Sequence, residues 1–350
     1  MRYYAGLDVS LAETSVCVVD EDGKIVREAK VASEPEALAI WLGGLGLPLA
    51  RVGLETGALA GWLCEEMTEL GVPNVVCMDA RHARAAMVAM IHKTDRNDAR
   101  GLAQMLRTGW FRQVHVKARR TMELRTLLTS RKTLVLKIGD VENQIRGSLH
   151  LFGIKLGTAK RRTFSQRVRE LTADLPRVAA ILDVLLQAHA AMLLSLDRLN
   201  RMLLEIAREH AVCRRLMTMP GVGAVVGLTF IAAIEDPARF AKSRSVGAIL
   251  GMVPRKHQSG EVDRNGRITK TGDSEARAAL FEAAHVMLHR VKKWSGLKAW
   301  ATKVAQRQGN KRATVALARK MAVVMHRMWI DGTTFRWCTA PEGAGSAATA

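Results

Sequence analysis

Four acidic residues occur in settings that suit phosphodiester chemistry on metal ions. Asp8 and Glu55 lie in or at the end of apolar, strand-like runs, and Asp95 and Asp98 are three residues apart. That spacing puts both side chains on one face at the start of a helix. Carboxylates about 4 Å apart repel by roughly 4 kcal/mol at an effective dielectric of about 20. If the fold gathers these four, they need a cation, and oxygen ligands alone select Mg²⁺ or Mn²⁺.

Chance could also place four acids in this order. Two details argue against it. Asp8 interrupts a strand that should otherwise be buried, where an unpaired charge is costly. Basic side chains also surround the aspartate pair and would suit incoming phosphates. The residues predicted to bind nucleic acid there are Lys93, Arg96 and Arg100, with His92 beside them.

A serine in a cationic segment is the second chemical candidate. Ser259 lies in a polar, glycine-punctuated stretch that reads as an exposed loop or ribbon. A serine that attacks phosphorus must lose its proton, and the developing charge must be stabilised. Ser274, in the first turn of a helix, is the alternative nucleophile, whereas Ser243 and Ser245 suit capping roles. The basic residues near Ser259, all predicted to bind nucleic acid, are Arg255, Lys256, His257, Arg264, Arg267 and Lys270.

Charge is divided unevenly along the 350 residues, whose net charge is +20. Residues 1–79 hold 5 Lys and Arg against 13 Asp and Glu, and the remainder holds 48 against 20. An acidic first segment and a basic remainder suit a metal-binding module joined to modules that bind a polyanion. The alternative is that the basic faces only keep the protein soluble.

Cysteine usage and hydropathy point to a cytosolic protein. No CxxC pair or zinc spacing is present, so we expect reduced thiols. A strand begins almost at the N-terminus, without the pattern of a signal peptide. No run of 18 uninterrupted apolar residues occurs, and no membrane span is expected. The cysteines are Cys17, Cys64, Cys77, Cys213 and Cys338.

The first third of the chain predicts an α/β domain. Alternation and turn signals predict strands at 2–10, 14–19, 25–31, 51–54 and 72–78, and helices at 56–70, 80–89 and 94–109. A capping-box pattern at Ser33 and Glu36, with Pro35 in the first turn, opens another helix that ends near Leu42. A strand meander followed by alternating helices and strands is the order of the ribonuclease-H-like fold.

The remainder reads as mainly helical. Apolar spacings of three and four predict long helices at 121–149 and 178–211, joined by a basic connector. They could form an antiparallel arm or pair between subunits. The turn Pro220-Gly221-Val222-Gly223 resembles a helix-hairpin-helix turn that holds phosphate; a dinucleotide fingerprint is disfavoured because no strand precedes it. Helices at 274–291 and 312–329 follow.

Together these residues resemble a known family. The chain, over about residues 3–330, closely resembles the IS-one-ten insertion-sequence transposases and the related Piv-type DNA invertases. The motifs that carry the resemblance are Gly6-Leu7-Asp8-Val9-Ser10, Leu54-Glu55-Thr56-Gly57, Lys93-Thr94-Asp95-Arg96-Asn97-Asp98-Ala99, Met219-Pro220-Gly221-Val222-Gly223 and Gly251-Met252-Val253-Pro254-Arg255-Lys256-His257-Gln258-Ser259-Gly260.

The resemblance implies a mechanism and partners. The N-terminal domain would be RuvC-like and bind Mg²⁺ (or Mn²⁺). A C-terminal serine, matching Ser259, would attack DNA and form a covalent intermediate. A coiled coil would assemble dimers into tetramers, and a structured guide RNA would pair with donor and target DNA. Glu261 departs from the family, which often has a small residue there, so Ser274 stays the alternative. The four metal ligands would be Asp8, Glu55, Asp95 and Asp98.

We therefore expect a bacterial, cytoplasmic, nucleoid-associated recombinase that acts on double-stranded element ends and target DNA. The expected divisions are a RuvC-like catalytic domain at 1–115, a helical coiled-coil and nucleic-acid-binding region at 116–212, a mainly α transposase domain at 213–338 and a disordered tail at 339–350. Two alternatives remain: a Mg²⁺-dependent junction endonuclease without a covalent intermediate, and a DNA-binding factor without enzymatic activity.

Overall fold

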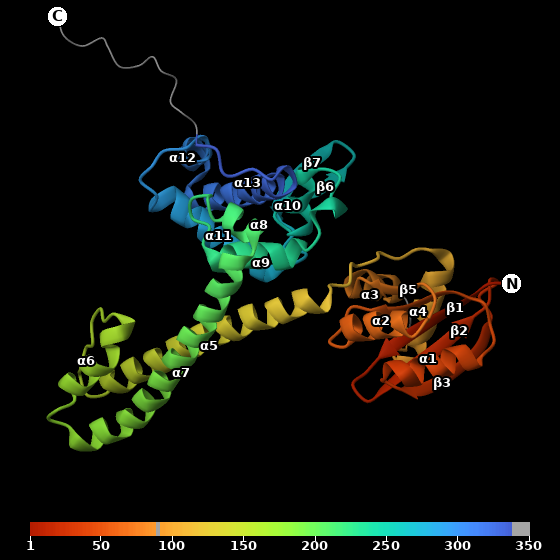
Figure 1. The fold of residues 1–350 in the computed structure, drawn as a ribbon, viewed down its shortest axis with the longest axis horizontal. Coiled ribbons are helices and arrows are strands. Elements are labelled where there is room, and N and C mark those ends of the chain that lie inside the picture. The colour runs from red at the N-terminus through yellow and green to blue at the C-terminus, as the bar shows by residue number, and fades with distance from the viewer. Residues whose placement is uncertain (89–91, 338–350) are drawn as a thin grey trace, which may run out of the picture. The chain divides into compact units, whose positions relative to one another are not determined.

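The computed structural model describes residues 1–88 and 92–337. The chain divides into two compact units, Met1–Met122 and Glu123–Ala350. Each unit is described by itself (Figure 1). The predicted tail at 339–350 lies outside the described residues, as does Ala89, the last residue of the predicted helix at 80–89.

The N-terminal unit is built on one five-stranded sheet with the order β3-β2-β1-β4-β5. Strands β1, β2 and β3 are antiparallel neighbours, whereas β4 runs parallel to β1 and β5 parallel to β4. This confirms the predicted order of a strand meander followed by alternating helices and strands. The strand bounds are β1 Tyr3–Val9, β2 Glu13–Val19, β3 Ile25–Ala32, β4 Leu49–Glu55 and β5 Val75–Met78.

Helices cover both faces of this sheet because its strands bury alternate side chains on opposite sides. On β2, Val16 and Val18 pack in one core with helices α1 and α2, whereas Cys17 and Val19 pack against α4. The α4 helix ends at Gly109 in the left-handed conformation, as predicted. The helix bounds are α1 Pro35–Gly44, α2 Ala60–Glu69, α3 Ala80–Met87 and α4 Asp95–Thr108.

The predicted capping box before α1 is wrong. The N-cap residue is Glu34, and no side chain caps this end of the helix. Ser33 is buried, its hydroxyl donates to the carbonyl of Ser10, and it lies 2.8 Å from the Thr14 hydroxyl. The Ser33 hydroxyl, which the local pattern predicted to cap the helix, is therefore used in tertiary hydrogen bonds instead.

The second unit begins with two long helices that run in opposite directions. Arg131 on α5 donates to Asn200 on α7 at 2.7 Å, and Glu142, further along α5, meets His189, earlier on α7, at 3.1 Å. A small apolar core closes the far end of the pair around Phe164. The two helices and this end form an arm, with bounds α5 Arg119–His150, α6 Phe164–Leu171 and α7 Pro176–Glu209.

Helix α7 is long and apolar enough to cross a membrane by length and composition alone. Its pattern of burial supplies another reason for that composition. Leu182, His189, Leu196 and Leu203 are all buried and recur every seven residues. A seven-residue repeat is the spacing of a helix that packs along another helix. Packing within the arm therefore explains the buried part of this apolar content, whereas Ile181, Val184 and Leu194 of the same helix are exposed.

The rest of the second unit is a helical body with one protruding β-ribbon. Its core joins α8, α9, α11, α12 and α13, and Leu124, Leu127 and Leu128 of α5 pack against it. Helix α12 was not predicted. The bounds are α8 Ala211–Leu216, α9 Ala224–Ile234, α10 Val246–Ile249, β6 Pro254–Ser259, β7 Val262–Ile268, α11 Ser274–His289, α12 Gly296–Gln308 and α13 Asn310–Asp331, with single 3₁₀ turns at Arg161–Thr163, Pro237–Arg239 and Ser243–Ser245.

Candidate active site

The register of two central strands brings the first two acids together. Parallel strands β1 and β4 pair Leu7 with Leu54. Asp8 and Glu55 are the next residues of these strands, so they occupy adjacent positions at the same edge of the sheet. The fold thus joins two acids that are far apart in sequence.

Two glycines let helix α4 reach that edge. Gly6 and Gly53 are paired across β1 and β4. A Cβ atom added to Gly6 would lie 2.4 Å from the Ala103 nitrogen and 2.4 Å from the Ala99 carbonyl oxygen, and one added to Gly53 would lie 2.7 Å from Leu106. Side chains two residues apart share a face of a strand. The acids that follow each glycine by two residues therefore face α4 as well.

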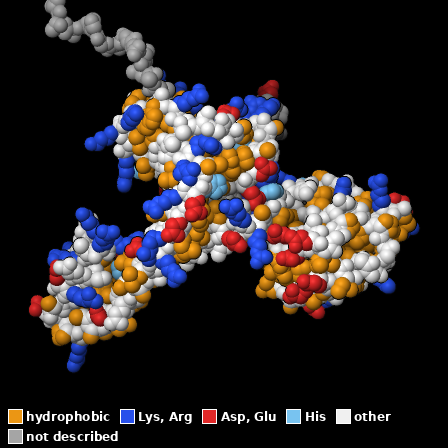
Figure 2. Space-filling view, in the orientation of Figure 1, with side chains coloured by type: hydrophobic (Ala, Val, Ile, Leu, Met, Phe, Trp, Pro, Cys, Tyr) orange, Lys and Arg blue, Asp and Glu red, His pale blue; other side chains and the backbone are white. Residues whose placement is uncertain are grey.

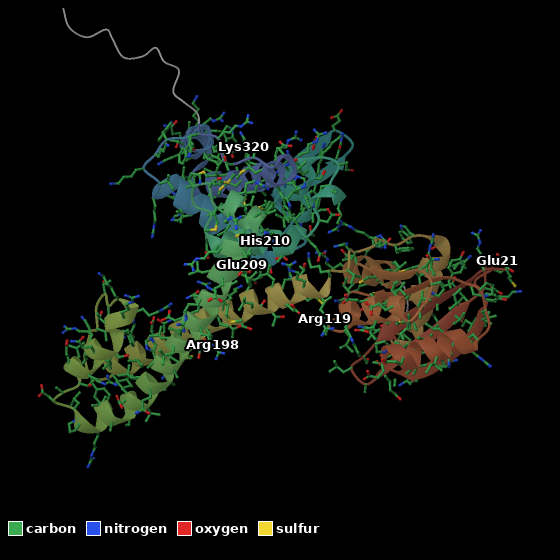
Figure 3. The ribbon with its side chains drawn as sticks, in the orientation of Figure 1. Glu21, Arg119, Arg198, Glu209, His210 and Lys320 are labelled. Atoms are coloured by element: carbon green, nitrogen blue, oxygen red, sulfur yellow. The ribbon has the colours of Figure 1, made fainter. Side chains whose placement is uncertain are left out.

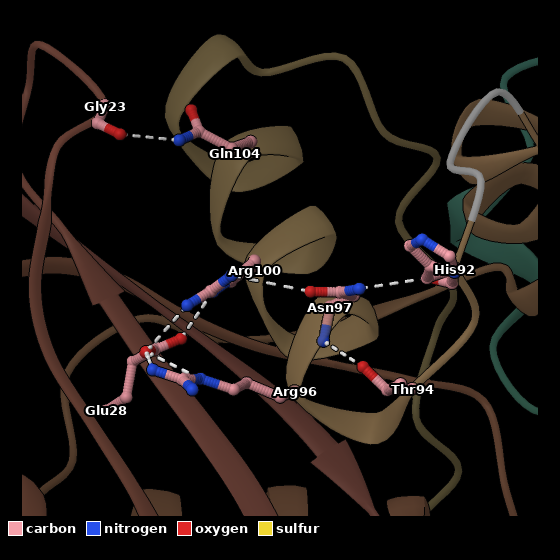
Figure 4. A network of polar contacts seen from close by, with 8 residues as sticks. All are labelled: Gly23, Glu28, His92, Thr94, Arg96, Asn97, Arg100 and Gln104. Atoms are coloured by element: carbon pink, nitrogen blue, oxygen red, sulfur yellow. Dashed lines mark hydrogen bonds and ion pairs between the residues drawn. The ribbon is translucent and has the colours of Figure 1, made fainter.

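The start of α4 supplies the other two acids. Thr94 caps the helix by accepting from the Asn97 amide at 3.2 Å, and Asp95 and Asp98 stand in the first turn. The Asn97 side chain donates to the His92 carbonyl at 3.0 Å, which ties the preceding loop to this turn (Figure 4). The helix start agrees with the predicted range of 94–109.

A separate ion-pair network fastens α4 to strand β3 (Figure 4). Glu28 on β3 accepts from Arg96 at 2.5 Å and from Arg100 at 2.6 Å. Hydrogen bonds from Arg100 and then Arg96 lower the pKa of Glu28 to about 2. Both arginines were predicted to bind nucleic acid; in this structure their guanidinium groups hold the helix, and contact with phosphate stays a prediction.

The four acids interact electrostatically at the sheet edge. Burial, together with three neighbouring negative charges, raises the pKa of Asp8 to about 6. Those charges belong to Asp98, Asp95 and Glu55. Burial and the charge of Asp98 raise the pKa of Glu55 as well, and Lys93 partly opposes both shifts. The cluster is a set of close carboxylates with one nearby ammonium group.

This set fits a divalent cation by its chemistry. Its donors are all oxygens, and their mutual repulsion is what a positive ion would relieve. Within residues 1–88 and 92–337, no three His, Cys, Asp or Glu side chains stand close enough to one point to hold an ion. Binding of a divalent cation would therefore require the carboxylate side chains to rotate toward a common point. A cavity of about 340 Å³ beside Glu55, lined also by Val9 and Ser10, leaves room at the edge.

Ser259 is the last residue of β6 and stands at the tip of the ribbon. It pairs with Val262 across a two-residue turn, where Gly260 has a φ of +55°. Only the first turn residue has a positive φ, which glycine adopts without strain. Every residue of β6 is exposed, including Ser259. His257 lies on the same face of the strand, opposite Arg264.

Comparison with known proteins identifies the chain. Residues 5–154 match the family described as DEDD_Tnp_IS110, Transposase, and residues 213–299 match the family described as Transposase IS116/IS110/IS902 family. The chain belongs to the IS110/IS116 transposase family. A DEDD transposase domain implies a ribonuclease-H-like fold, in agreement with the observed sheet.

Individual relatives agree over most of the length. The transposase for insertion sequence element IS1111A of Coxiella burnetii is 27% identical over 95% of this chain and 90% of its own length. The transposase for insertion sequence element IS1328 of Yersinia enterocolitica is 25% identical over 82% of this chain and 86% of its own. The pilin gene-inverting protein of Moraxella bovis is 26% identical, over 32% of this chain and 34% of its own.

The other predicted site residues of this transposase have varied surroundings. Lys256 pairs with Asp263 at 3.1 Å across the ribbon, and Arg255 reaches the Thr269 carbonyl at 3.5 Å. Arg264 and Arg267 lie exposed on β7. Ser274, the alternative nucleophile, is the first residue of α11 at the foot of the ribbon.

The predicted glycine turn does lie between two helices of the transposase. Gly221 has a φ of +84°, and a Cβ there would lie 2.3 Å from the Ala283 carbonyl of α11. Close packing accounts for this glycine. Phosphate binding by the turn stays a prediction.

Sequence reasoning missed three residues that shape the site. Gly6 and Gly53 admit α4, and Glu28 anchors it. A signal for the glycines was present, since each precedes a candidate acid by two residues in a strand. Glu28 had no local signal, because its partners come from a distant helix.

Acidic and basic side chains are unevenly distributed over the transposase. In the space-filling view, Asp and Glu side chains form groups on the N-terminal unit, whereas on the arm they stand among many Lys and Arg side chains (Figure 2). Arg119, at the start of α5, and Arg198, on α7, are among the basic side chains of the long helices (Figure 3). This agrees with the uneven charge of the sequence.

Proposed function

We propose that this chain excises and inserts a mobile DNA element, using the carboxylate cluster and Ser259 on the same strand break. The observation that carries the proposal is the gathering of Asp98, Asp95 and Glu55 around Asp8, whose pKa is raised to about 6 by burial and by these charges. Such a cluster is unfavourable alone and becomes favourable with a bound cation. The family match supports DNA transposition as the overall activity.

The four acids would hold Mg²⁺ or Mn²⁺, which when bound polarises a phosphate and stabilises the leaving oxygen. The Ser259 oxygen would attack phosphorus, forming a phosphoserine ester and releasing one sugar oxygen of the DNA strand. The serine proton passes to a base, and the released sugar oxygen takes up a proton. Attack by a sugar hydroxyl on the phosphoserine would rejoin DNA without an external energy source, because one phosphate ester replaces another.

The basic ribbon and arm would hold nucleic acid mainly through phosphates. Following the family resemblance, we propose a structured guide RNA that pairs with donor and target DNA, and assembly of dimers into tetramers. The exposed apolar side chains of Ile181, Val184 and Leu194 on α7 support a role for the arm in that assembly. We further propose that the protein acts on chromosomal DNA in the bacterial cytoplasm.

Trapping the intermediate tests the proposal. End-labelled element DNA is incubated with the protein and Mg²⁺, denatured, and examined for label attached to protein. We expect attachment with the parent chain and none with Ser259→Ala or Asp8→Asn. Peptide mapping of the adduct separates Ser259 from Ser274. Asp22→Asn, an exposed acid in the turn after β2, is the matched control and should retain the adduct.

Two outcomes would replace this mechanism. Magnesium-dependent cleavage without any attached label would favour the endonuclease that uses water. Binding without cleavage, by a chain that carries all four acids, would favour a DNA-binding factor.

A further inference from the structure

A cavity of about 330 Å³ lies at the foot of the ribbon, between the segment before β6, the end of β7 and helices α11 and α13. We call it the ribbon-foot cavity. The residues that define it are Met252, Ile268, Lys270, Ser274, Ala278 and Phe281. Its volume is at the small end of the range for ligand sites, roughly 300–1,000 Å³. Neither Ser259 nor any of the four acids lines it.

The lining of the ribbon-foot cavity combines an apolar floor with a polar rim. Met252 and Ala278 contribute to the floor, and Phe281 is 36% exposed although it is a large aromatic residue. Lys270, Ser274 and Glu282 add a cation, a hydroxyl and a carboxylate to the lining. An aromatic face with a few hydrogen-bonding groups suits a flat heterocycle attached to a phosphate.

The rim of the cavity is held rigidly. Lys270 has a φ of +55°, a conformation that is uncommon for residues other than glycine. Its amide donates to the Gly251 carbonyl at 3.0 Å, and the Arg277 guanidinium donates to the carbonyls of Leu250, Thr271 and Gly272 at 3.0–3.2 Å. A cavity with fixed walls loses little conformational freedom when it binds a ligand.

We propose that the ribbon-foot cavity receives one unpaired base of the DNA substrate. The base would stack on Phe281, and Lys270 would meet its phosphate. The inference rests on the proposed function for the identity of the nucleic acid, since the ribbon that carries Ser259 would meet DNA. An extruded base can be read by stacking and by hydrogen bonds to its edge.

The distance along the ribbon is compatible with this role. Ile268 lines the cavity and pairs with Pro254, five residues before Ser259 on the same strand. Five residues of extended strand span about 17 Å. Duplex DNA rises about 3.4 Å per base pair, so this span covers roughly five base pairs. We therefore place the extruded base within about five base pairs of the phosphate that Ser259 would attack.

Binding of DNA with a single unpaired base tests the inference. The probe is a short duplex with one bulged 2-aminopurine, compared with the same duplex fully paired, and the protein is the full chain carrying Ser259→Ala. We expect 2-aminopurine fluorescence to rise on binding as the base leaves its neighbours. Phe281→Ala should weaken binding of the bulged duplex about five- to hundredfold, the effect of one lost stacking contact.

A second variant guards against a folding defect. Ala278 is exposed on α11, so Ala278→Leu should leave the fold intact while it fills the cavity, and it should weaken bulge binding as well. Both variants should bind the paired duplex within about twofold of the parent, because phosphate contacts dominate that affinity. Ile330→Ala, which removes an exposed apolar side chain outside the cavity, should change neither affinity.

Three results would overturn the inference. The first is equal binding of the bulged duplex by the parent and both cavity variants. The second is tighter binding of an RNA bulge than of a DNA bulge through the same cavity. The third is a change of sedimentation with Ala278→Leu alone, which would assign the cavity to a second copy of the chain. Every protein in this test carries Ser259→Ala, so the test measures binding and not strand cleavage. A negative result would therefore not contradict the serine mechanism. If the serine mechanism itself proved wrong, the binding test could still be interpreted.

Discussion

At the scale of single residues, Asp8 stands out because its surroundings destabilise its negative charge. It is half-buried, and the negative charges of Asp98, Asp95 and Glu55 act on it together. A structural acid would normally gain partners that lower its pKa, as Glu28 does with Arg100 and Arg96. A carboxylate that is destabilised by its own neighbours is a common sign of a functional site.

Replacing Asp8 by Asn should stabilise the metal-free protein near neutral pH. The folded pKa of about 6 lies above the ordinary 3.8, so Asp8 lowers stability progressively as pH rises from about 4 through 6. At pH 7 the variant should gain roughly 1 kcal/mol, after allowance for solvent screening. At pH 4 the gain should vanish. Urea denaturation at both pH values measures it, and Mg²⁺ should stabilise the parent but not Asp8→Asn.

Glu28→Gln should have the opposite pH dependence. The folded pKa of about 2 lies below the ordinary 4.5, so the stability that Glu28 contributes is present above pH 4.5 and lost as pH falls toward 2. We expect a loss of about 1–2 kcal/mol at pH 7, since its side chain is 15% exposed and two arginines lose their acceptor. Glu21→Gln, at an exposed position in the turn after β2 (Figure 3), should be neutral. Equal urea midpoints for the two variants would contradict this.

At the scale of elements, the contact between α4 and β1 decides whether the acids meet. Gly6→Ala would put a methyl group 2.4 Å from two backbone atoms of α4, so the helix must shift. We expect a loss of at least about 3 kcal/mol of unfolding free energy, and weaker Mg²⁺ binding in the fraction that folds. Gly43→Ala in α1 has nothing within 4 Å and should be neutral or gain up to about 1 kcal/mol. Calorimetry with and without Mg²⁺ compares the two.

Elements with strong local signals were predictable from the sequence. The alternation in β1 and β2, the Thr94 cap and the Gly109 end of α4 all depend on nearby residues. Two of the four acids could be placed on a helix face and two at strand ends, because both statements follow from local periodicity. The order of the strands then put them at one edge.

Features that depend on distant partners were not predictable. Ser33 matched a capping pattern but bonds to Ser10, across a strand. Glu28 binds a helix that lies far along the sequence. The ribbon-foot cavity joins β7, α11 and α13, and no short window contains that combination. Helix α12 follows a loop and has only two buried residues, Ala301 and Val304, so its periodicity is weak.

At the scale of the whole molecule, the distribution of charge separates two tasks. Residues 1–79 are net acidic, and the rest carries 48 basic residues against 20 acidic ones. A cation site needs local negative charge, whereas DNA binding needs positive charge distributed over the surface. Because the excess of acidic residues and the excess of basic residues lie in different segments, the acids repel less of the DNA backbone.

The basic segments should make DNA binding steeply dependent on salt. Each phosphate that is neutralised releases counterions, and six to ten such contacts lower affinity about 10³–10⁵-fold between 50 and 200 mM salt. Fluorescence anisotropy with a paired duplex measures the slope of log affinity against log salt. Arg264→Ala and Arg267→Ala, both at exposed positions of β7, should each reduce that slope by about one if their guanidinium groups touch phosphate. Arg96→Ala should leave the slope unchanged, because Glu28 already holds that guanidinium. An unchanged slope in both ribbon variants, with a reduced slope for Arg96→Ala, would move the DNA contact from the ribbon to the start of α4.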